Sequence, residues 1–280
     1  MSFQEQLLNW LCCAAVYTEW TNDKGWLNKN IDILKQCFQS MLNRDNPEKT
    51  MRNGIMALES TRTMKGSEIT TYDAIDESLG QAVNNVYIAG KCWAVYVMLA
   101  KMFSEHGLHD LVEESFQQAK KCSETIIKYV TAEDYLPAIF DCSNSSKIIP
   151  AIEGLIFPYF SGCKDLLDKN GIFGEYILAL EKHVKTILTK GVCLFNNSAW
   201  KLSSNSENTW LSKIYLYQFI VRNILGIERN KSYLADKAHY NWLIDSKNSY
   251  WCWSDQIISG IASESRYYPR GVTCILWLYE

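Results

Sequence analysis

Apolar residues recur at helical spacing through most of this 280-residue chain, and this periodicity constrains its fold more than any other feature. The segment Val83–Glu105 is a markedly apolar helical stretch. A more amphipathic helical segment follows it directly across Gly107. The pattern predicts helices at about 3–20, 26–42, 83–105, 108–130, 149–167 with an interruption at Pro158, 173–189, 209–225 and 231–244.

The connections between these segments alternate in length. Short turns join some neighbours, whereas 43–82, 131–149 and 196–208 are long and polar. We find no strand-rich region and no domain boundary, so we expect a single all-α domain over 1–280. Antiparallel helix pairs with their longer loops on one side fit an (α/α) toroid. A closed ring of six pairs needs about twelve helices, so the sequence predicts an incomplete (α/α)6 barrel.

Composition indicates an ordinary globular protein. Hydrophobic residues make up 48% and charged residues 21%, and the net charge of -3 favours no nucleic-acid partner. No apolar run has the roughly 20 uncharged residues that would indicate a membrane span. The N-terminus lacks a basic segment ahead of its apolar stretch, which argues against a signal peptide. We therefore expect a cytoplasmic protein without a membrane partner.

The ten cysteines lie mostly inside apolar helical patterns, so we interpret them as reduced core residues. Zinc motifs of the Cys-x-x-Cys type are absent from the sequence. His106 and His109 have no third ligand nearby and are interpreted as surface residues. Phosphate-binding loops, serine elbows and dinucleotide fingerprints are absent too, so we expect no metal and no cofactor.

One polar loop carries the main candidate for chemistry. Asp73 follows Thr71 and Tyr72 directly, in the hexapeptide EITTYD at 68–73. A carboxyl group held beside hydroxyls and apolar residues can donate a proton to a sugar oxygen. The alternative is that Asp73 caps a helix or bonds to turn amides, as loop aspartates often do. Asp76 is a nearby competitor that we interpret as structural.

Aromatic residues and further polar positions fit a sugar-binding cleft. The chain has ten Trp and sixteen Tyr, most of which must serve the core. Asp255 follows Trp253 by two residues, and such a pair can bind vicinal hydroxyls while the indole stacks on the ring. Arg270 lies in a rigid turn and could bind a hydroxyl or orient a nucleophile, or pair with a core carboxylate.

Two glutamates and one lysine are weaker candidates. Glu153 and Glu68 could contact sugar hydroxyls, but a helix cap or a surface charge is the favoured interpretation of both. Lys201 is the weakest of the set.

Several segments taken together resemble glycoside hydrolase family 52, whose known members are mainly β-xylosidases. They occur in the family's order along nearly the whole chain: QLLNW at 6–10, CAAVY at 13–17, SMLNRD at 40–45, EITTYD at 68–73, SLGQ at 78–81, GKCWA at 90–94, PAIEGLIFP at 150–158, WKLSS at 200–204, WLSKIY at 210–215, WSDQ at 253–256 and YPRGVT at 268–273.

This resemblance implies a retaining, exo-acting hydrolase with an N-terminal β-sandwich and a catalytic (α/α)6 barrel. Such enzymes remove xylose from the non-reducing ends of xylooligosaccharides or β-xylosides, a step in xylan degradation. The related family 116 has a similar Thr-Tyr-Asp element in which the aspartate is the acid/base, and that role falls here on Asp73. Thr71 then becomes a sugar contact. The chain resembles only the C-terminal part of such an enzyme, so the nucleophile is expected outside it.

Other readings of the sequence stay open. The chain could be a non-catalytic helical remnant that binds carbohydrate, or one half of a split enzyme. A helical scaffold for protein contacts ranks last because regular repeats are absent. An incomplete toroid would leave apolar faces such as Leu7, Leu11 and 275–277 unpaired. Those faces would favour contact with the missing N-terminal part or with a second copy of the chain.

Overall fold

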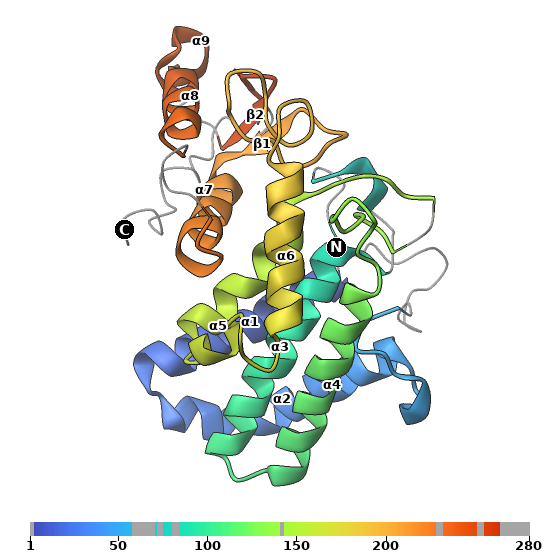
Figure 1. The fold of residues 1–280 in the computed structure, drawn as a ribbon. Helices are drawn as coiled ribbons and strands as arrows, with labels where there is room; N and C mark the ends of the chain where they lie inside the picture. Colours follow the sequence, from blue (N-terminus) through green and yellow to red (C-terminus); the bar gives the residue numbers. More distant parts are fainter. Residues whose placement is uncertain are drawn as a thin grey trace, which may run out of the picture.

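A computed structural model of the chain describes residues 3–57, 71, 75–79, 84–140, 143–227, 232–250 and 255–263. Within these residues the regular structure is mostly helical (Figure 1). The predicted all-α class is confirmed. In Figure 1, the α3–α4 pair lies at one end of the molecule, and α8, α9 and a small sheet lie at the other.

Helix α3 (Val86–Glu105) forms the centre of the core. Asn85 caps its N-terminus by accepting a hydrogen bond from the Ile88 amide at 2.8 Å. Gly107 adopts φ +69°, which turns the chain back into α4 (His109–Ile127) alongside α3. Helix α3 is long and apolar enough to cross a membrane, but 94% of its most apolar 18-residue stretch is buried inside the protein. It is therefore a core helix.

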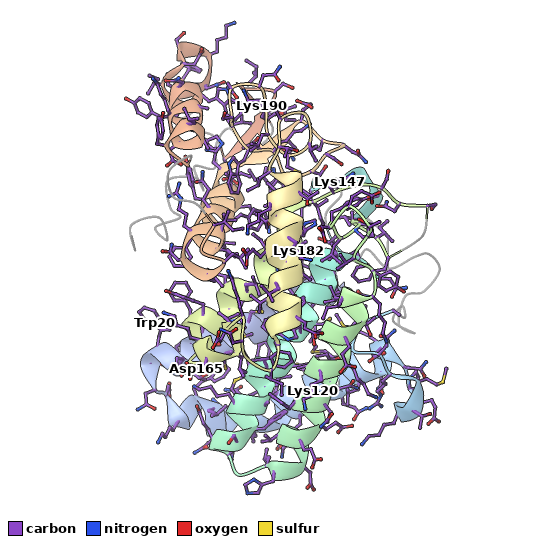
Figure 2. All side chains as sticks on the ribbon, in the orientation of Figure 1. Trp20, Lys120, Lys147, Asp165, Lys182 and Lys190 are labelled. Carbon is purple, nitrogen blue, oxygen red and sulfur yellow. The ribbon has the colours of Figure 1, made fainter. Side chains whose placement is uncertain are left out.

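Helices α1 (Phe3–Thr21) and α2 (Lys24–Asp45) form a second pair, joined by a turn in which Asp23 caps α2 through the Trp26 amide. Leu11 on α1 is fully buried, so the expectation that it lies on an unpaired face is wrong. Helix α1 instead exposes aromatic side chains, with Trp20 61% exposed. Figure 2 shows Trp20 at the edge of the molecule beside α5, where its indole nitrogen donates to the Phe160 carbonyl at 3.0 Å.

The stretch predicted as one helix at 149–167 is instead broken into short pieces. They are the 3-10 helix η3 (Ile149–Leu155), α5 (Ile156–Phe160) and the 3-10 helix η4 (Lys164–Leu167). A close approach of η3 to α3 fixes this path: a Cβ on Gly154 would lie 2.2 Å from the Gly90 carbonyl oxygen. Only glycine permits that approach, and it places Glu153 against α3.

The remaining elements pack around this core. Short 3-10 helices occur at η1 (Lys49–Met51) and η2 (Glu77–Leu79), and α6 (Gly174–Ile187) follows η4. Helix α7 (Leu211–Phe219) runs into the π-helical turn η5 (Ile220–Ile224) and is followed by α8 (Ser232–Ile244) and α9 (Ser246–Ser249).

A small antiparallel sheet joins one strand that precedes α7 to two strands that follow α9. Its strands are β1 (Asn208–Trp210), β2 (Gln256–Ile258) and β3 (Ile261–Ala262), in the order β1-β2-β3. Thr209 pairs with Ile257 in its centre. Strands of two or three residues show no alternation of apolar and polar positions, so the sequence did not reveal them.

The cysteines that the structure describes are all free thiols, and five of those seven are buried: Cys12, Cys92, Cys122, Cys163 and Cys193. Burial raises the pKa of the Cys92 thiol to about 12 and of the Cys193 thiol to about 12. Such thiols stay protonated and act as small apolar groups in the core.

Candidate active site

Glu153 on η3 lies at the centre of a buried cluster of charges. Its side chain accepts from Lys91 on α3 at 2.9 Å and from Lys213 on α7 at 2.7 Å. The Tyr217 hydroxyl donates to it at 2.5 Å. Glu153 is only 5% exposed, so its interpretation as a surface charge is wrong.

Tyr87 on α3 connects Glu153 to a second buried carboxylate, that of Glu5 on α1. The Tyr87 hydroxyl donates to Glu5 Oε1 at 2.7 Å and lies 3.2 Å from Glu153 Oε1. It accepts from Lys91 Nζ at 2.7 Å and from Lys213 Nζ at 3.1 Å. One phenol therefore contacts both acids and both bases.

Two carboxylates and two ammonium groups balance the charge of this cluster. Burial alone would raise the pKa of Glu153, but the charges of Lys213 and Lys91 outweigh burial and hold that pKa well below its usual range. Burial, Glu153 and Glu5 together raise the pKa of Tyr87 well above its usual range. The glutamate is thus ionised and the phenol is neutral at neutral pH.

Thr71, a predicted site residue, is part of the same cluster. Its side chain is fully buried, and Oγ1 donates to Glu5 Oε2 at 2.8 Å across 66 residues of sequence. We call the connected side chains the Glu153 network: Glu5, Thr71, Tyr87, Lys91, Glu153, Lys213 and Tyr217.

Asp76 follows Asp73 in sequence as Thr71 precedes it, and we call Thr71 and Asp76 the two anchors. Asp76 is also buried and hydrogen-bonded. Its Oδ1 accepts from the Ser78 amide at 2.9 Å and the Ser78 hydroxyl at 2.6 Å, and its Oδ2 accepts from the Ser146 hydroxyl. Burial would raise the pKa of Asp76, but the hydrogen bonds from Ser146 and Ser78 outweigh it and lower that pKa. These bonds support the structural interpretation of Asp76.

Thr71 and Asp76 therefore bracket the Tyr72-Asp73-Ala74 tripeptide in sequence. Tyr72 and Asp73 themselves lie outside the described residues, as do the other predicted positions Glu68, Trp253 and Arg270.

Asp255 lies at the start of α7 rather than in the Glu153 network. It is fully buried, and its carboxylate accepts from the Ser212 amide at 2.8 Å and from the Ser212 hydroxyl at 3.2 Å. Lys213 directly follows Ser212 in α7. The bonds from Ser212 to Asp255 therefore hold the end of α7 from which Lys213 reaches Glu153. Lys201, the weakest candidate, pairs with Glu207 at 2.8 Å.

Five members of the network were not predicted from the sequence: Glu5, Tyr87, Lys91, Lys213 and Tyr217. Four of them, all but Glu5, share a spacing of four residues, which places two side chains on one face of a helix. Tyr87 and Lys91 on α3 show it, as do Lys213 and Tyr217 on α7. Lys91 lies inside an otherwise apolar segment of α3. It is the clearest indication of a buried acidic partner, since buried lysines are almost always paired.

A cavity of about 810 Å³ lies elsewhere, between the end of α6, the α7–η5 segment and α8. Apolar side chains line much of it, together with Lys185, Lys190, Gln218 and Arg222. Lys190 marks this region near the end of the molecule that holds the sheet (Figure 2). The cavity shares no lining residue with the Glu153 network.

No protein-family model matches the chain. It is 56% identical over 277 residues to a beta-xylosidase from Geobacillus stearothermophilus. That match includes 99% of this chain, and the chain spans 39% of the relative's length. A second beta-xylosidase from the same organism is 33% identical over 126 residues, 45% of this chain and 20% of that relative. Nearly the whole chain is therefore similar to part of a β-xylosidase.

Proposed function

We propose that the chain is part of a retaining β-xylosidase of glycoside hydrolase family 52, with Asp73 as the general acid/base. The observation that carries this proposal is the 56% identity to the Geobacillus beta-xylosidase along 99% of the chain. The described residues on either side of Asp73 in sequence add support, because Thr71 and Asp76 are both buried and hydrogen-bonded.

Retaining hydrolysis uses two carboxyl groups about 5–5.5 Å apart. In the proposed reaction, Asp73 protonates the leaving oxygen while a nucleophilic carboxylate attacks the anomeric carbon. Asp73 then deprotonates the water that releases the sugar. The nucleophile belongs, in this proposal, to the part of the enzyme that this chain does not span, which is consistent with its 39% coverage of the relative.

The substrate in this proposal is a xylooligosaccharide or β-xyloside, from which one xylose is removed at the non-reducing end. Thr71 and Tyr72 would contact the sugar beside the acid, and Trp253, Asp255 and Arg270 would form other parts of the subsite. The Asp255 carboxylate already accepts two hydrogen bonds from Ser212.

The helical chain would contribute to an (α/α)6 catalytic domain whose other helices come from the rest of the enzyme, either in one polypeptide or from a separate one. Exposed aromatic residues on α1, namely Trp10, Tyr17 and Trp20, offer an apolar surface for that contact or for a second copy.

A chimera tests the proposal. This chain would replace the matched stretch of the Geobacillus beta-xylosidase, and hydrolysis of an aryl β-xyloside would be measured. We expect the chimera to cleave the substrate and Asp73→Asn to lower kcat by about 100-fold or more. Asp165→Asn, at an exposed position on η4, is the matched control and should leave kcat unchanged. A folded chimera that binds xylose without turnover would contradict the enzymatic role.

A further inference from the structure

We propose that the cavity between the end of α6, the α7–η5 segment and α8 is a binding site for a small aromatic monocarboxylate. Its volume of about 810 Å³ lies in the range of pockets that hold small organic molecules. The cavity shares no lining residue with the Glu153 network, so this inference does not rest on the proposed function.

The apolar part of the lining would hold the body of the ligand. Leu188 and Leu194 line the cavity beyond the end of α6, and Val221 lines it from η5. Trp200, which is only 7% exposed, adds an aromatic residue to the lining. Contact with these side chains would remove the aromatic body of a ligand from water, which favours binding.

The charges of the lining favour an anion. Each charged residue among the described lining residues is a cation, namely Lys185, Lys190 or Arg222. Two of these charges are already compensated, since Lys185 pairs with Glu181 at 2.5 Å and Arg222 pairs with Asp236 at 3.0 Å.

Lys190 is the cation that has no ion-pair partner among the described residues. Figure 2 shows it beyond the upper end of α6, whereas Lys182 lies partway along that helix. A carboxylate could bind the Lys190 ammonium group without displacing an existing partner, and a charged hydrogen bond of this kind is among the stronger ones. One uncompensated positive charge matches a ligand with a single carboxylate.

The backbone on one side of the cavity departs from regular α-helix geometry. The Leu225 amide donates to the Ile220 carbonyl at 2.9 Å, which closes the π-helical turn η5. Such turns are rare and occur frequently at functional sites. This turn contributes Val221 and Arg222 to the lining, so it supports a binding site independently of the charges.

Contacts between α7–η5 and α8 hold the wall of the cavity in place. The Gln218 side-chain amide donates to Asp236 Oδ1 at 3.0 Å, and Arg222 donates to Asp236 Oδ2 at 3.0 Å. Gln218 and Arg222 both line the cavity, and Asp236 belongs to α8. A wall that is already formed costs less to order when a ligand binds.

Calorimetric titration of the full chain tests the preference for an anion. The probes are naphthylacetate and its neutral amide, naphthylacetamide, which share an aromatic body and differ in charge. We expect the carboxylate to bind about 10-fold more tightly than the amide, because hydrogen bonds to charged groups are the stronger ones. Equal affinity for the two probes, or binding of neither, would overturn the proposal.

Lys190→Ala tests the position of the carboxylate. This variant should reduce the preference for naphthylacetate to about twofold or less and leave the affinity for the amide unchanged. Lys182→Ala is the matched control, because Lys182 is an exposed lysine on α6 that does not line the cavity, and it should keep the preference. A preference that survives Lys190→Ala, or that falls equally in both variants, would overturn the proposal.

Ala235→Phe tests whether the probes occupy this cavity. Ala235 lines the cavity from α8, so a phenyl ring there should weaken binding of both probes by about 10-fold or more. Melting temperatures show whether the variant is folded. Thr189→Trp, at an exposed position in the same lining, replaces it if Ala235→Phe unfolds.

Undiminished binding in a folded cavity-filling variant would overturn the proposal, because the probes would then bind elsewhere. None of these titrations measures hydrolysis, so an inactive chimera would count against the proposed function alone.

Discussion

The two anchors that bracket Asp73 are built from different chemistry. On one side, Thr71 is held by the Glu153 network, in which two buried carboxylates face the buried Lys91 and the half-buried Lys213. On the other side, Asp76 is held by hydroxyl and amide donors from Ser78 and Ser146, with no cation among those donors. The first anchor links four elements far apart in sequence, whereas the second combines the neighbouring Ser78 with Ser146, which lies 70 residues away.

This difference predicts how much stability the protein should lose when each anchor is removed. Removing one member of a buried, balanced set of charges leaves its partners uncompensated in a medium that solvates them poorly. Removing a carboxylate that is satisfied by neutral donors leaves only unpaired hydroxyl and amide groups. The Glu153 network should therefore be the costlier anchor to damage.

The largest effect is expected for Glu153→Ala. Lys91 would remain buried and Lys213 half-buried without their shared counter-charge, so the free energy of unfolding should fall by about 3–5 kcal/mol. Urea denaturation followed by circular dichroism measures this. Glu175→Ala, at an exposed position on α6, is the control and should change stability by less than about 0.5 kcal/mol.

Asp76→Ala should have a smaller effect, a loss of about 1–3 kcal/mol, because the Ser78 and Ser146 donors would lose their acceptor without any charge being stranded. The same denaturation experiment measures it, with Asp165→Ala as control. A loss for Asp76→Ala equal to that for Glu153→Ala would remove the distinction between the two anchors.

Acid should weaken the Asp76 anchor before the Glu153 network. A carboxylate whose folded pKa is depressed stabilises the protein above its unfolded pKa, and this is lost as pH falls through the folded pKa. The stability difference between the unmodified chain and Asp76→Asn should therefore shrink below about pH 3.9. The stability difference between the unmodified chain and Glu153→Gln should persist to lower pH, because the pKa of Glu153 is held well below its usual range.

Urea denaturation at several pH values between 5 and 3 checks this order. His183 and His239, whose burial lowers their pKa values to about 4 and about 3, charge in all three proteins and cancel in the differences. A Glu153→Gln difference that vanishes at a higher pH than the Asp76→Asn difference would contradict the expectation.

Salt should have the smallest effect. Ions screen exposed charges but reach buried pairs poorly. The cost of Glu153→Ala should stay the same within about 0.5 kcal/mol between 0.1 M and 1 M salt, roughly the precision of such differences. The exposed pair of Lys35 with Asp32 at 3.1 Å should contribute at most about 1 kcal/mol, and less at high salt. A strong salt dependence for Glu153→Ala would mean that water enters the network.

The sequence predicted most of the fold because long helices carry their own periodic signal. Val83–Glu105 was placed within three residues of α3. The stretch after Pro150 was predicted poorly, because the close approach of Gly154 to Gly90 depends on tertiary contact. Thr71 was singled out beside Asp73, yet its partner Glu5 could not be found from sequence, since only folding joins positions 66 residues apart.

Proton donation by Asp73 is the central claim, and its dependence on the leaving group tests it most directly. In the chimera, kcat/KM of Asp73→Asn would be measured on a dinitrophenyl β-xyloside, whose leaving group needs no proton, and on xylobiose, whose leaving group does. The account predicts a loss on xylobiose about 100-fold or more beyond the loss on the aryl substrate. Equal losses on both substrates, or no loss on xylobiose, would contradict it.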